Sequence, residues 1–464
     1  MKHLLISFLL LQSAMTYADG RNEDRQVLEV EGMRLSPFWA QEYIGADLVK
    51  KKMRNRDDLK RIAFAIFDVG FEEQFVNRTL DIPVDFGMNG RRRITAHHGT
   101  SVANNINGHG HMGVSEIVDY VQLAKVSPSV FYFGAVSSLK RLEVKPMIIS
   151  NSVGWSGDLI KDLATEIDDM GIIWVLAAGN DYPNEMAVFE REAPVIKVGS
   201  YSPFGQQTIY SQESEQLTIM APADEYLASL DGKGEKVLFG ATSGATPLVS
   251  GMIANVKSLI PSLSRLQVEK LIQKTAIKSI NYHYRKIKTG LFNGLKFYEA
   301  VSLIKSKCGT ENQSCIEREI ELINDDTFSQ RFSHEGANLY CSGSSEDLSA
   351  QELDELREDV MLRPSDRNLP RLLACVYNRM NLTLNGDYYE NIYLTYHNPE
   401  MLMKKITERA KNAAISKFEN SSALRDVELF DEEMIDLLND IAQKDYGIGS
   451  YRAKELLERV TQEL

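Results

Sequence analysis

The chain has 464 residues, 43% of them hydrophobic, and carries a formal net charge of −13 at pH 7. A chain of this length can bury a large core and is typical of two or three domains. Its acidic balance argues against nonspecific nucleic-acid binding, which needs a basic face, and against attraction to an anionic membrane.

The N-terminus has the layout of a secretory signal peptide over residues 1–18, and we interpret residues 19–36 as an N-terminal extension. Lys2 and His3 precede the run LLISFLLL, which is too short to cross a bilayer as a helix. The alternative is an ordinary buried helix. No later stretch of 18 or more apolar residues occurs, so we expect a secreted or periplasmic protein without a membrane span.

Residues 61–305 alternate strand-like apolar runs with helical patterns. The strand candidates are IAFAIF (62–67), YVQLAKV (120–126), MIIS (147–150) and IIWVLAA (172–178). Between the last two, apolar residues recur at helical spacing behind Asp158, a good helix N-cap. This alternation predicts an α/β fold, with a mainly parallel sheet that helices cover on both faces.

Two polar segments stand in the first half of this region. Asp68 ends the apolar run in AIFDVG, where a buried carboxylate must be paired or hydrogen-bonded. His98 in HHGTSVANNI stands at the start of a helical run, and the positive end of a helix favours the neutral imidazole that a general base needs. Taken alone, each segment is also explained as a turn or a helix cap.

Two further segments follow in the second half. Asn180 comes after the buried strand in LAAGND, from which a side-chain amide can donate to a developing oxyanion. Ser243 in GATSGATP stands at the mouth of an apolar helix, where a base can activate its hydroxyl. Because polar residues at the carboxyl ends of parallel strands tend to line one site, we expect the four residues to lie together.

These segments resemble the sequence boxes of the subtilases, the subtilisin-like serine peptidases. HGTSVA (98–103) agrees with H-G-T-x-V-A at every fixed position, and AAGN (177–180) agrees with A-A-G-N. DVG (68–70) and ATSGATP (241–247) are similar to D-[ST]-G and G-T-S-x-A-[ST]-P, and the chain order Asp, His, Ser is that of subtilisin. The likeness covers about residues 37–305, so it implies a subtilisin-like peptidase domain there.

The resemblance implies a serine endopeptidase that acts on protein or peptide substrates through an acyl-enzyme intermediate. Ser243 would attack the peptide carbonyl, His98 would take and return the proton, and Asp68 would orient the imidazole. Asn180 and the backbone N–H of Ser243 would hold the oxyanion. An extended substrate would pair with a cleft by strand addition. The residues implied to line that cleft are Ser152, Val153, Gly154, Ala177, Ala178 and Gly179.

Four residues near the site depart from the subtilase pattern: Val69, Ala241, Gly244 and Leu248. Val69 replaces a small hydroxyl residue, and Gly244 and Leu248 replace a usual methionine and a common histidine. If the glycine that Ala241 replaces has a positive φ, alanine at this position costs about 1 kcal/mol. The alternative is that Gly240 takes the positive φ of the turn instead. These departures motivate an alternative, a catalytically impaired pseudoprotease that acts as a binding or regulatory scaffold.

From about residue 306 the strand signals fade and acidic residues outnumber basic ones. We expect a linker at 306–347 and an acidic, mostly α-helical domain at 348–464. The helical patterns lie at 348–362, 400–418, 431–443 and 451–464. The alternatives for this domain are to bind a protein partner, to restrain substrate access, to anchor the enzyme to envelope material, or only to stabilise it. It could also replace a folding propeptide, since only 18 residues separate Ala18 from the start of the likeness.

The four cysteines all lie in the last third of the chain: Cys308, Cys315, Cys341 and Cys375. Secretion permits disulfides, and four cysteines allow three pairings. The short loop between them makes Cys308–Cys315 the first expectation, and four buried thiols are the alternative.

A metal site is the other alternative to a serine-based site. Its candidates are His97, His98, His109 and His111, but no cysteine is near them. We expect no catalytic metal and no required cofactor. The resemblance leaves a structural calcium open, although no calcium-loop pattern places it.

Overall fold

The computed structural model describes residues 27–30, 32–72, 76, 96–108, 112–126, 131–154, 159–181, 186, 191–208, 210–212, 214–224, 227–230, 236–279, 289–344, 348–402 and 404–406. The predicted signal peptide lies outside these ranges. So do His109, His111 and the predicted helices at 431–443 and 451–464. Of the predicted helix at 400–418, the described residues 400–402 and 404–406 are helical.

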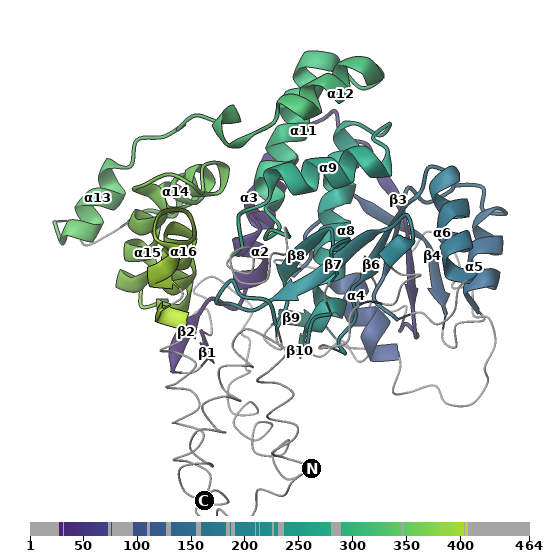
Figure 1. Ribbon diagram of the computed structural model, residues 1–464, viewed down its shortest axis with the longest axis horizontal. Coiled ribbons are helices and arrows are strands. Elements are labelled where there is room, and N and C mark those ends of the chain that lie inside the picture. The colour runs from purple at the N-terminus through teal and green to yellow at the C-terminus, as the bar shows by residue number, and fades with distance from the viewer. Residues whose placement is uncertain are drawn as a thin grey trace, which may run out of the picture.

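In the described part of the chain, six strands form a central sheet in the order β4–β3–β5–β6–β7–β8, and every neighbouring pair is parallel (Figure 1). The strands are β3 (Ile62–Asp68), β4 (Val118–Lys125), β5 (Ile148–Asn151), β6 (Ile173–Ala177), β7 (Ile196–Tyr201) and β8 (Ile219–Pro222). The predicted runs match β3 to β6 within a few residues. This sheet confirms the α/β fold that the sequence predicts.

Side chains of the strands alternate between two cores, one on each face of the sheet. On β3, Phe64 and Ile66 belong to the larger core, whereas Ala65 and Phe67 belong to the smaller one. This two-sided burial explains why the strands read as continuous apolar runs. The larger core lies under α4 (Ala96–Asn107), α8 (Ala241–Leu259), α9 (Arg265–Thr275) and α11 (Gly294–Cys308).

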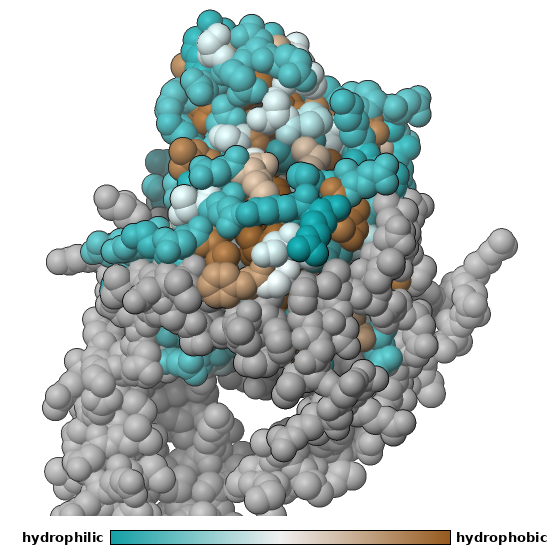
Figure 2. All heavy atoms as spheres, turned by 90° about the vertical axis from the view of Figure 1, so that its right-hand side faces the viewer, coloured by the Kyte–Doolittle hydropathy of each residue, from teal (hydrophilic) through white to brown (hydrophobic). Residues whose placement is uncertain are grey.

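The smaller core lies under α5 (Phe131–Leu139) and α6 (Leu159–Asp169), on the right of Figure 1. Seen from that side, the described surface is mostly hydrophilic, with hydrophobic residues between the polar ones (Figure 2). Helices therefore cover both faces, as the sequence predicts. Among the described residues, no helix combines the length and the apolar character needed to cross a membrane.

The C-terminal helices pack on the beginning of the chain, on α2 (Trp39–Tyr43) and α3 (Ala46–Arg54). The rings of Tyr43 and Tyr388 stack with their centroids 3.7 Å apart. Arg357, only 3% exposed, donates to both carboxylate oxygens of Asp47 at 2.7 and 2.9 Å. The helices concerned are α14 (Ala350–Leu362), α15 (Leu369–Arg379) and α16 (Thr383–His397). The first and last parts of the chain thus share the larger core.

The segment at 306–347, which we expect to be a linker, contains α12 (Gln313–Leu322), η2 (Asp325–Thr327) and α13 (Glu335–Ser342). The domain boundaries themselves stay predictions. The remaining strands form two small hairpins, β1 (Leu28–Val30) with β2 (Met33–Leu35) and β9 (Leu227–Leu230) with β10 (Lys236–Phe239).

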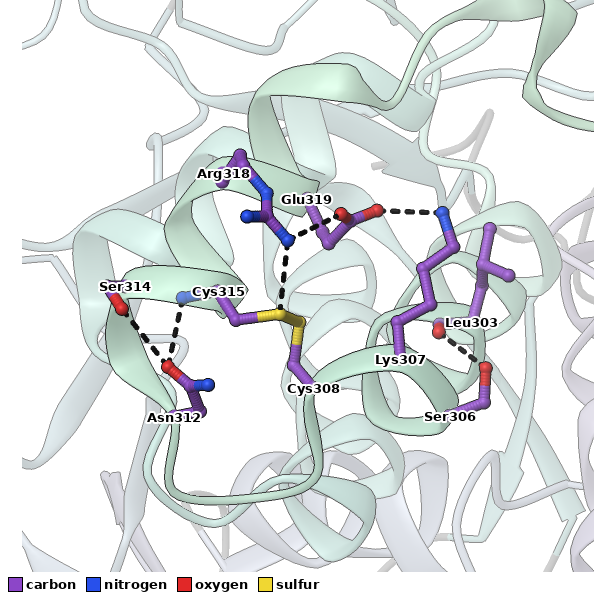
Figure 3. The surroundings of a disulfide bond; sticks show 9 residues. All are labelled: Leu303, Ser306, Lys307, Cys308, Asn312, Ser314, Cys315, Arg318 and Glu319. Carbon is purple, nitrogen blue, oxygen red and sulfur yellow. Dashed lines mark hydrogen bonds and ion pairs between the residues drawn. A yellow bond between two sulfur atoms is a disulfide. The ribbon is translucent and has the colours of Figure 1, made fainter.

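Two disulfides tie the helices of this segment. Cys308 pairs with Cys315, the first expectation from the sequence, and this bond joins the end of α11 to the start of α12 (Figure 3). Asn312 caps α12 by accepting from the backbone N–H of Cys315 at 3.2 Å. The second bond, Cys341–Cys375, joins α13 to α15.

Candidate active site

Asp68 is the last residue of β3 and is fully buried. Its Oδ1 atom accepts from the backbone N–H of Val69 at 2.7 Å and lies 2.7 Å from Nδ1 of His98. Oδ2 has no partner among the described residues. Val69 stands where subtilases carry a hydroxyl residue, and it brings no side-chain donor to this carboxylate.

The start of α4 approaches the end of β3 so closely that only glycine fits at residue 99. A Cβ atom on Gly99 would lie 2.3 Å from the carbonyl oxygen of Gly70. The hydroxyl of Thr100 accepts from the backbone N–H of Glu72 at 2.9 Å and ties the two segments together. The sequence HGT therefore brings His98 to the carboxylate of Asp68.

The pKa of His98 is raised above its ordinary value. Burial lowers this pKa, but the charge of Asp68 and its hydrogen bond raise it by more. The sequence predicts that the helix start favours the neutral imidazole, whereas Asp68 favours the protonated form, so the two influences oppose each other at His98. The ring meets the edge of Phe239, with centroids 5.2 Å apart at 78°, and 32% of the His98 side chain is exposed.

Ser243 lies in the first turn of α8 and is 8% exposed. Its Oγ atom donates to the carbonyl oxygen of Ser152 at 3.0 Å. The single hydroxyl proton therefore points at Ser152 in this conformation. Catalytic hydrogen bonds are often loose before substrate binds, so this geometry is compatible with a later turn toward His98.

Asn180 caps the start of α8. Its Oδ1 atom accepts from the backbone N–H and the hydroxyl of Thr242, at 3.1 and 2.8 Å. A backbone N–H can only donate, so the bonded atom must be the amide oxygen and not the nitrogen. No bond among the described residues uses Nδ2, which can therefore donate to another acceptor.

Gly179, next to Asn180, has a φ of +97°, in the left-handed region that favours glycine. The box AAGN therefore sets both the turn after β6 and the position of the amide of Asn180.

The expected cleft residues lie at one edge of the sheet, because β5 and β6 are parallel neighbours and end together. Ser152 and Ala178 are buried, whereas Gly154 is exposed and no described atom lies within 4 Å of a Cβ built on it. The residues at this edge are Ser152, Val153 and Gly154 after β5, and Ala177, Ala178 and Gly179 at the end of β6.

Two residues that support this edge were not found from the sequence. The hydroxyl of Tyr132 donates to Oδ1 of Asn151 at 3.1 Å and to the carbonyl of Val153 at 3.4 Å. The backbone N–H of Val153 also donates to Oδ1 of Asn151, at 3.3 Å. Asn151 precedes Ser152 and could have been inferred from ISNSVG, whereas Tyr132 carries no local signal.

Ala241 has a φ of +58°, in the left-handed region, whereas Gly240 has a φ of −152°. Of the two alternatives that the sequence left open, alanine thus takes the strained position. The described residues contain no group of three or more His, Cys, Asp or Glu side chains suited to a metal. Of the four histidines that are candidates for a metal site, only the side chain of His98 is among the described ones, so the metal alternative stays untested.

Comparison with protein families identifies a match to the subtilase family over residues 86–312. His98, Asn180 and Ser243 lie inside this match. Asp68 lies before it, so its place at the site depends on the contact with His98.

Two curated relatives show how far the likeness extends. Alkaline elastase YaB of Bacillus sp. (strain YaB) is 30% identical over 188 residues, which are 39% of this chain and 50% of the elastase. The extracellular protease of Xanthomonas campestris pv. campestris is 29% identical over 154 residues, which are 31% of this chain and 27% of that protein. The chain thus spans half the length of the first relative and about a quarter of the second.

Among solved structures, a chain of the structure described as "Structural basis of subtilase cytotoxin SubAB assembly" is 17% identical, with a TM-score of 0.47. The likeness covers 61% of this chain and 98% of that chain. Over residues 86–312, just under half of its length, this chain is thus similar to the subtilase family.

Proposed function

We propose that this protein is a secreted serine endopeptidase that acts through Ser243, His98 and Asp68. The observation that carries the proposal is the 2.7 Å contact between His98 Nδ1 and Asp68 Oδ1. Ser243 lies at the same edge of the sheet, because it is bonded to Ser152 at the end of β5, the neighbour of β3.

In the proposed mechanism, Nδ1–H of His98 donates to Asp68, which leaves a lone pair on Nε2. Ser243 turns its hydroxyl from Ser152 to Nε2 and loses its proton as Oγ attacks the substrate carbonyl. His98 then gives this proton to the leaving amine. A water molecule, activated by the same imidazole, hydrolyses the acyl-enzyme ester and restores Ser243.

Two donors would hold the negative charge on the carbonyl oxygen during this attack. One is the amide Nδ2 of Asn180, and the other is the backbone N–H of Ser243 in the first turn of α8. Support for this role comes from the two bonds to Thr242, which fix the orientation of the Asn180 amide before substrate arrives. Donors fixed in advance need no reorganisation when the charge develops.

The substrate would be an extended protein or peptide segment that pairs with residues 152–154 as an added strand. The exposure of Gly154, with no described atom within 4 Å of a Cβ built on it, supports this role. The alanine and glycine residues at 177–179 would leave room for a substrate side chain on the other side of the cleft.

A fluorophosphonate probe tests the proposed nucleophile directly. It should label Ser243 in the native protein, and labelling should disappear in Ser243→Ala and in His98→Ala. The same preparation should cleave an unfolded protein. An unlabelled Ser243 in folded wild-type protein, together with no cleavage, would refute the peptidase.

The alternative of an impaired subtilase scaffold has one observation in its favour. Ala241 adopts a φ of +58° two residues before the nucleophile, in place of the glycine of the subtilase pattern, and this conformation costs a residue with a Cβ atom about 1–2 kcal/mol. A scaffold would bind peptides without labelling by the probe, so the same experiment separates the two functions.

Secretion or export to the periplasm also belongs to the proposal. The two disulfides support it, because such bonds persist in oxidising compartments. A structural calcium ion remains a proposal without assigned ligands, and a protein partner for the acidic helical domain remains one without an assigned surface. Activity that survives calcium chelation would argue against a structural calcium ion. A stable monomer after mild extraction from its source would argue against a protein partner of the helical domain.

A further inference from the structure

We propose that the hydroxyl of Ser152 positions the nucleophile, by replacing the backbone N–H that Pro247 lacks. This inference rests on the proposed function of Ser243. It goes beyond the cleft role of Ser152, because it assigns a task to the side chain and not only to the main chain.

The carbonyl of Ser243 has lost its normal partner in α8. In an α-helix the carbonyl of residue i accepts from the N–H of residue i+4, which is residue 247 here. Pro247 has no N–H, and a proline ring crowds the carbonyl four residues before it. α8 nevertheless continues through Pro247 to Leu259. Because Ser243 is only 8% exposed, this carbonyl needs a donor from the protein.

Ser152 supplies that donor. Its Oγ atom donates to the carbonyl oxygen of Ser243 at 3.0 Å, and Ser152 is itself only 5% exposed. In return, the hydroxyl of Ser243 donates to the carbonyl of Ser152, also at 3.0 Å. Two opposed bonds therefore join the nucleophile to the strand end that the substrate would pair with.

The bond at Ser243 completes a set that fixes three successive peptide groups. Asn180 accepts from the N–H of Thr242, and the hydroxyl of Thr246 donates to the carbonyl of Thr242 at 2.8 Å. Ser152 donates to the carbonyl of Ser243. The φ and ψ of Ser243 are thus restrained on both sides. Its N–H and its Oγ, the two groups that the reaction would use, depend on this restraint.

A second hydroxyl of α8 gives a matched control. The hydroxyl of Ser250 lies 2.8 Å from the carbonyl of Thr246 and 3.0 Å from the hydroxyl of Ser150 on β5, so it also links α8 to this strand. It lies one turn after Pro247, in the regular part of the helix. Ser250→Ala therefore removes a buried α8–β5 bond without affecting the carbonyl that Pro247 leaves without a donor.

The test is a double-mutant cycle between Ser152→Ala and Pro247→Ala in the full chain. The readouts are the rate at which a small fluorophosphonate labels Ser243 and the denaturant midpoint of unfolding. The probe has no peptide backbone, so its rate does not report substrate pairing at residue 152. With Pro247 present, Ser152→Ala should slow labelling about tenfold and lower the midpoint, because a buried carbonyl loses its donor.

With Pro247→Ala present, Ser152→Ala should slow labelling less than about twofold, because alanine restores an N–H at position 247. Ser250→Ala should have the same effect in both backgrounds. Equal effects of Ser152→Ala in both backgrounds would overturn the inference. If Pro247→Ala does not fold, Ser152→Thr and Ser152→Val replace the cycle, since they differ only in the hydroxyl, and equal labelling rates would overturn it.

Failure of the proposed function gives a different result. If Ser243 is not labelled in any variant, the peptidase is wrong. The denaturant midpoints of the four cycle proteins still report whether Ser152 and Pro247 are coupled.

Discussion

The Nδ1 atom of His98, in α4, lies 2.7 Å from the Oδ1 atom of Asp68 at the end of β3. Burial lowers the pKa of His98, but the charge of Asp68 and this hydrogen bond raise it above the ordinary value of 6.5. Because of this raised pKa, activity and stability should depend on pH in opposite directions.

Activity should rise with pH through a midpoint above 6.5, because only the neutral imidazole can accept the proton of Ser243. Stability should move the other way. Since the folded-state pKa is higher than the unfolded one, the contact stabilises the protein fully below pH 6.5, and this contribution is lost as pH rises through the folded-state pKa.

Both trends can be measured on one preparation, as the pH dependence of the labelling rate of Ser243 and of the free energy of unfolding. His98→Gln is the control for stability, since its unfolding should lose the part of the pH dependence that His98 causes. A rate midpoint at or below 6.5 would contradict the role of Asp68 in raising the pKa of His98.

Asn180→Asp should separate the two tasks of Asn180. A carboxylate keeps an oxygen that accepts from Thr242, so the cap of α8 should survive and the free energy of unfolding should change little. It has no amide donor for the oxyanion, and kcat should fall by about 10²–10³-fold. A circular-dichroism melt measures the change in stability, and steady-state kinetics measure the change in kcat.

Asn180→Leu completes the comparison, because it removes the cap as well as the donor. It should lower kcat by a similar factor and should also destabilise the protein by about 1 kcal/mol. Full activity of Asn180→Asp would show that Asn180 serves only as a cap.

Ala241→Gly should stabilise the protein. A left-handed φ costs a residue with a Cβ atom about 1–2 kcal/mol, whereas glycine adopts it freely. Glycine also adds about 0.4–1 kcal/mol of unfolded-state entropy, so a net gain of about 0.5–1 kcal/mol is expected. Chemical denaturation measures this difference.

Ala245→Gly is the matched control, since Ala245 lies in the same helix but does not have a positive φ. Among the described non-glycine residues, only Ala241 and Asn381 do. The same substitution there should destabilise the protein by roughly 1 kcal/mol. Destabilisation by Ala241→Gly would mean that the strain is not released.

The sequence predicted the sheet, the strand ends and the place of the polar site because these depend on local patterns. A strand end followed by a glycine turn positions Asp68, and the AAGN box positions Asn180, each without information from distant residues. The position of the strain was not predictable, since either Gly240 or Ala241 could absorb the turn into α8. Which of them does so depends on how α8 docks on β5.

Contacts between distant parts of the chain were also beyond the sequence. Helical periodicity indicated that the C-terminal helices have apolar faces, but not what those faces cover. The stacking of Tyr388 on Tyr43 and the burial of Arg357 against Asp47 follow from tertiary packing alone. The pKa of His98 is a further example. The helix start predicts a preference for the neutral imidazole, but the tertiary contact with Asp68 raises the pKa of His98.

Arg357 and Asp47 provide the last prediction, which concerns the helical region as a part of the folded protein. The Arg357 side chain is 4% exposed, and it also donates to the carbonyl of Glu42 at 3.1 Å. Arg357→Met should destabilise the protein by about 3 kcal/mol, because it leaves a largely buried carboxylate without its partner. Arg357→Met with Asp47→Leu should recover much of this loss, because both charges are then removed.

The pair Lys51–Asp354 is the control for this prediction, since it joins the same two helices, α3 and α14, at the surface. The Lys51 side chain is 58% exposed, so Lys51→Met should cost less than about 1 kcal/mol. Denaturant unfolding of the wild type and the three variants, followed by tryptophan fluorescence, tests the ranking. If Arg357→Met costs no more than Lys51→Met, the C-terminal helices do not stabilise the N-terminal ones through this contact.

Expression of residues 19–310 extends this test to the whole helical region. If Arg357→Met has little effect, the fragment should be soluble and should refold as the full chain does. If Arg357→Met has a strong effect, the fragment should fail to refold, because Tyr43 and Asp47 lose the C-terminal helices that pack on them.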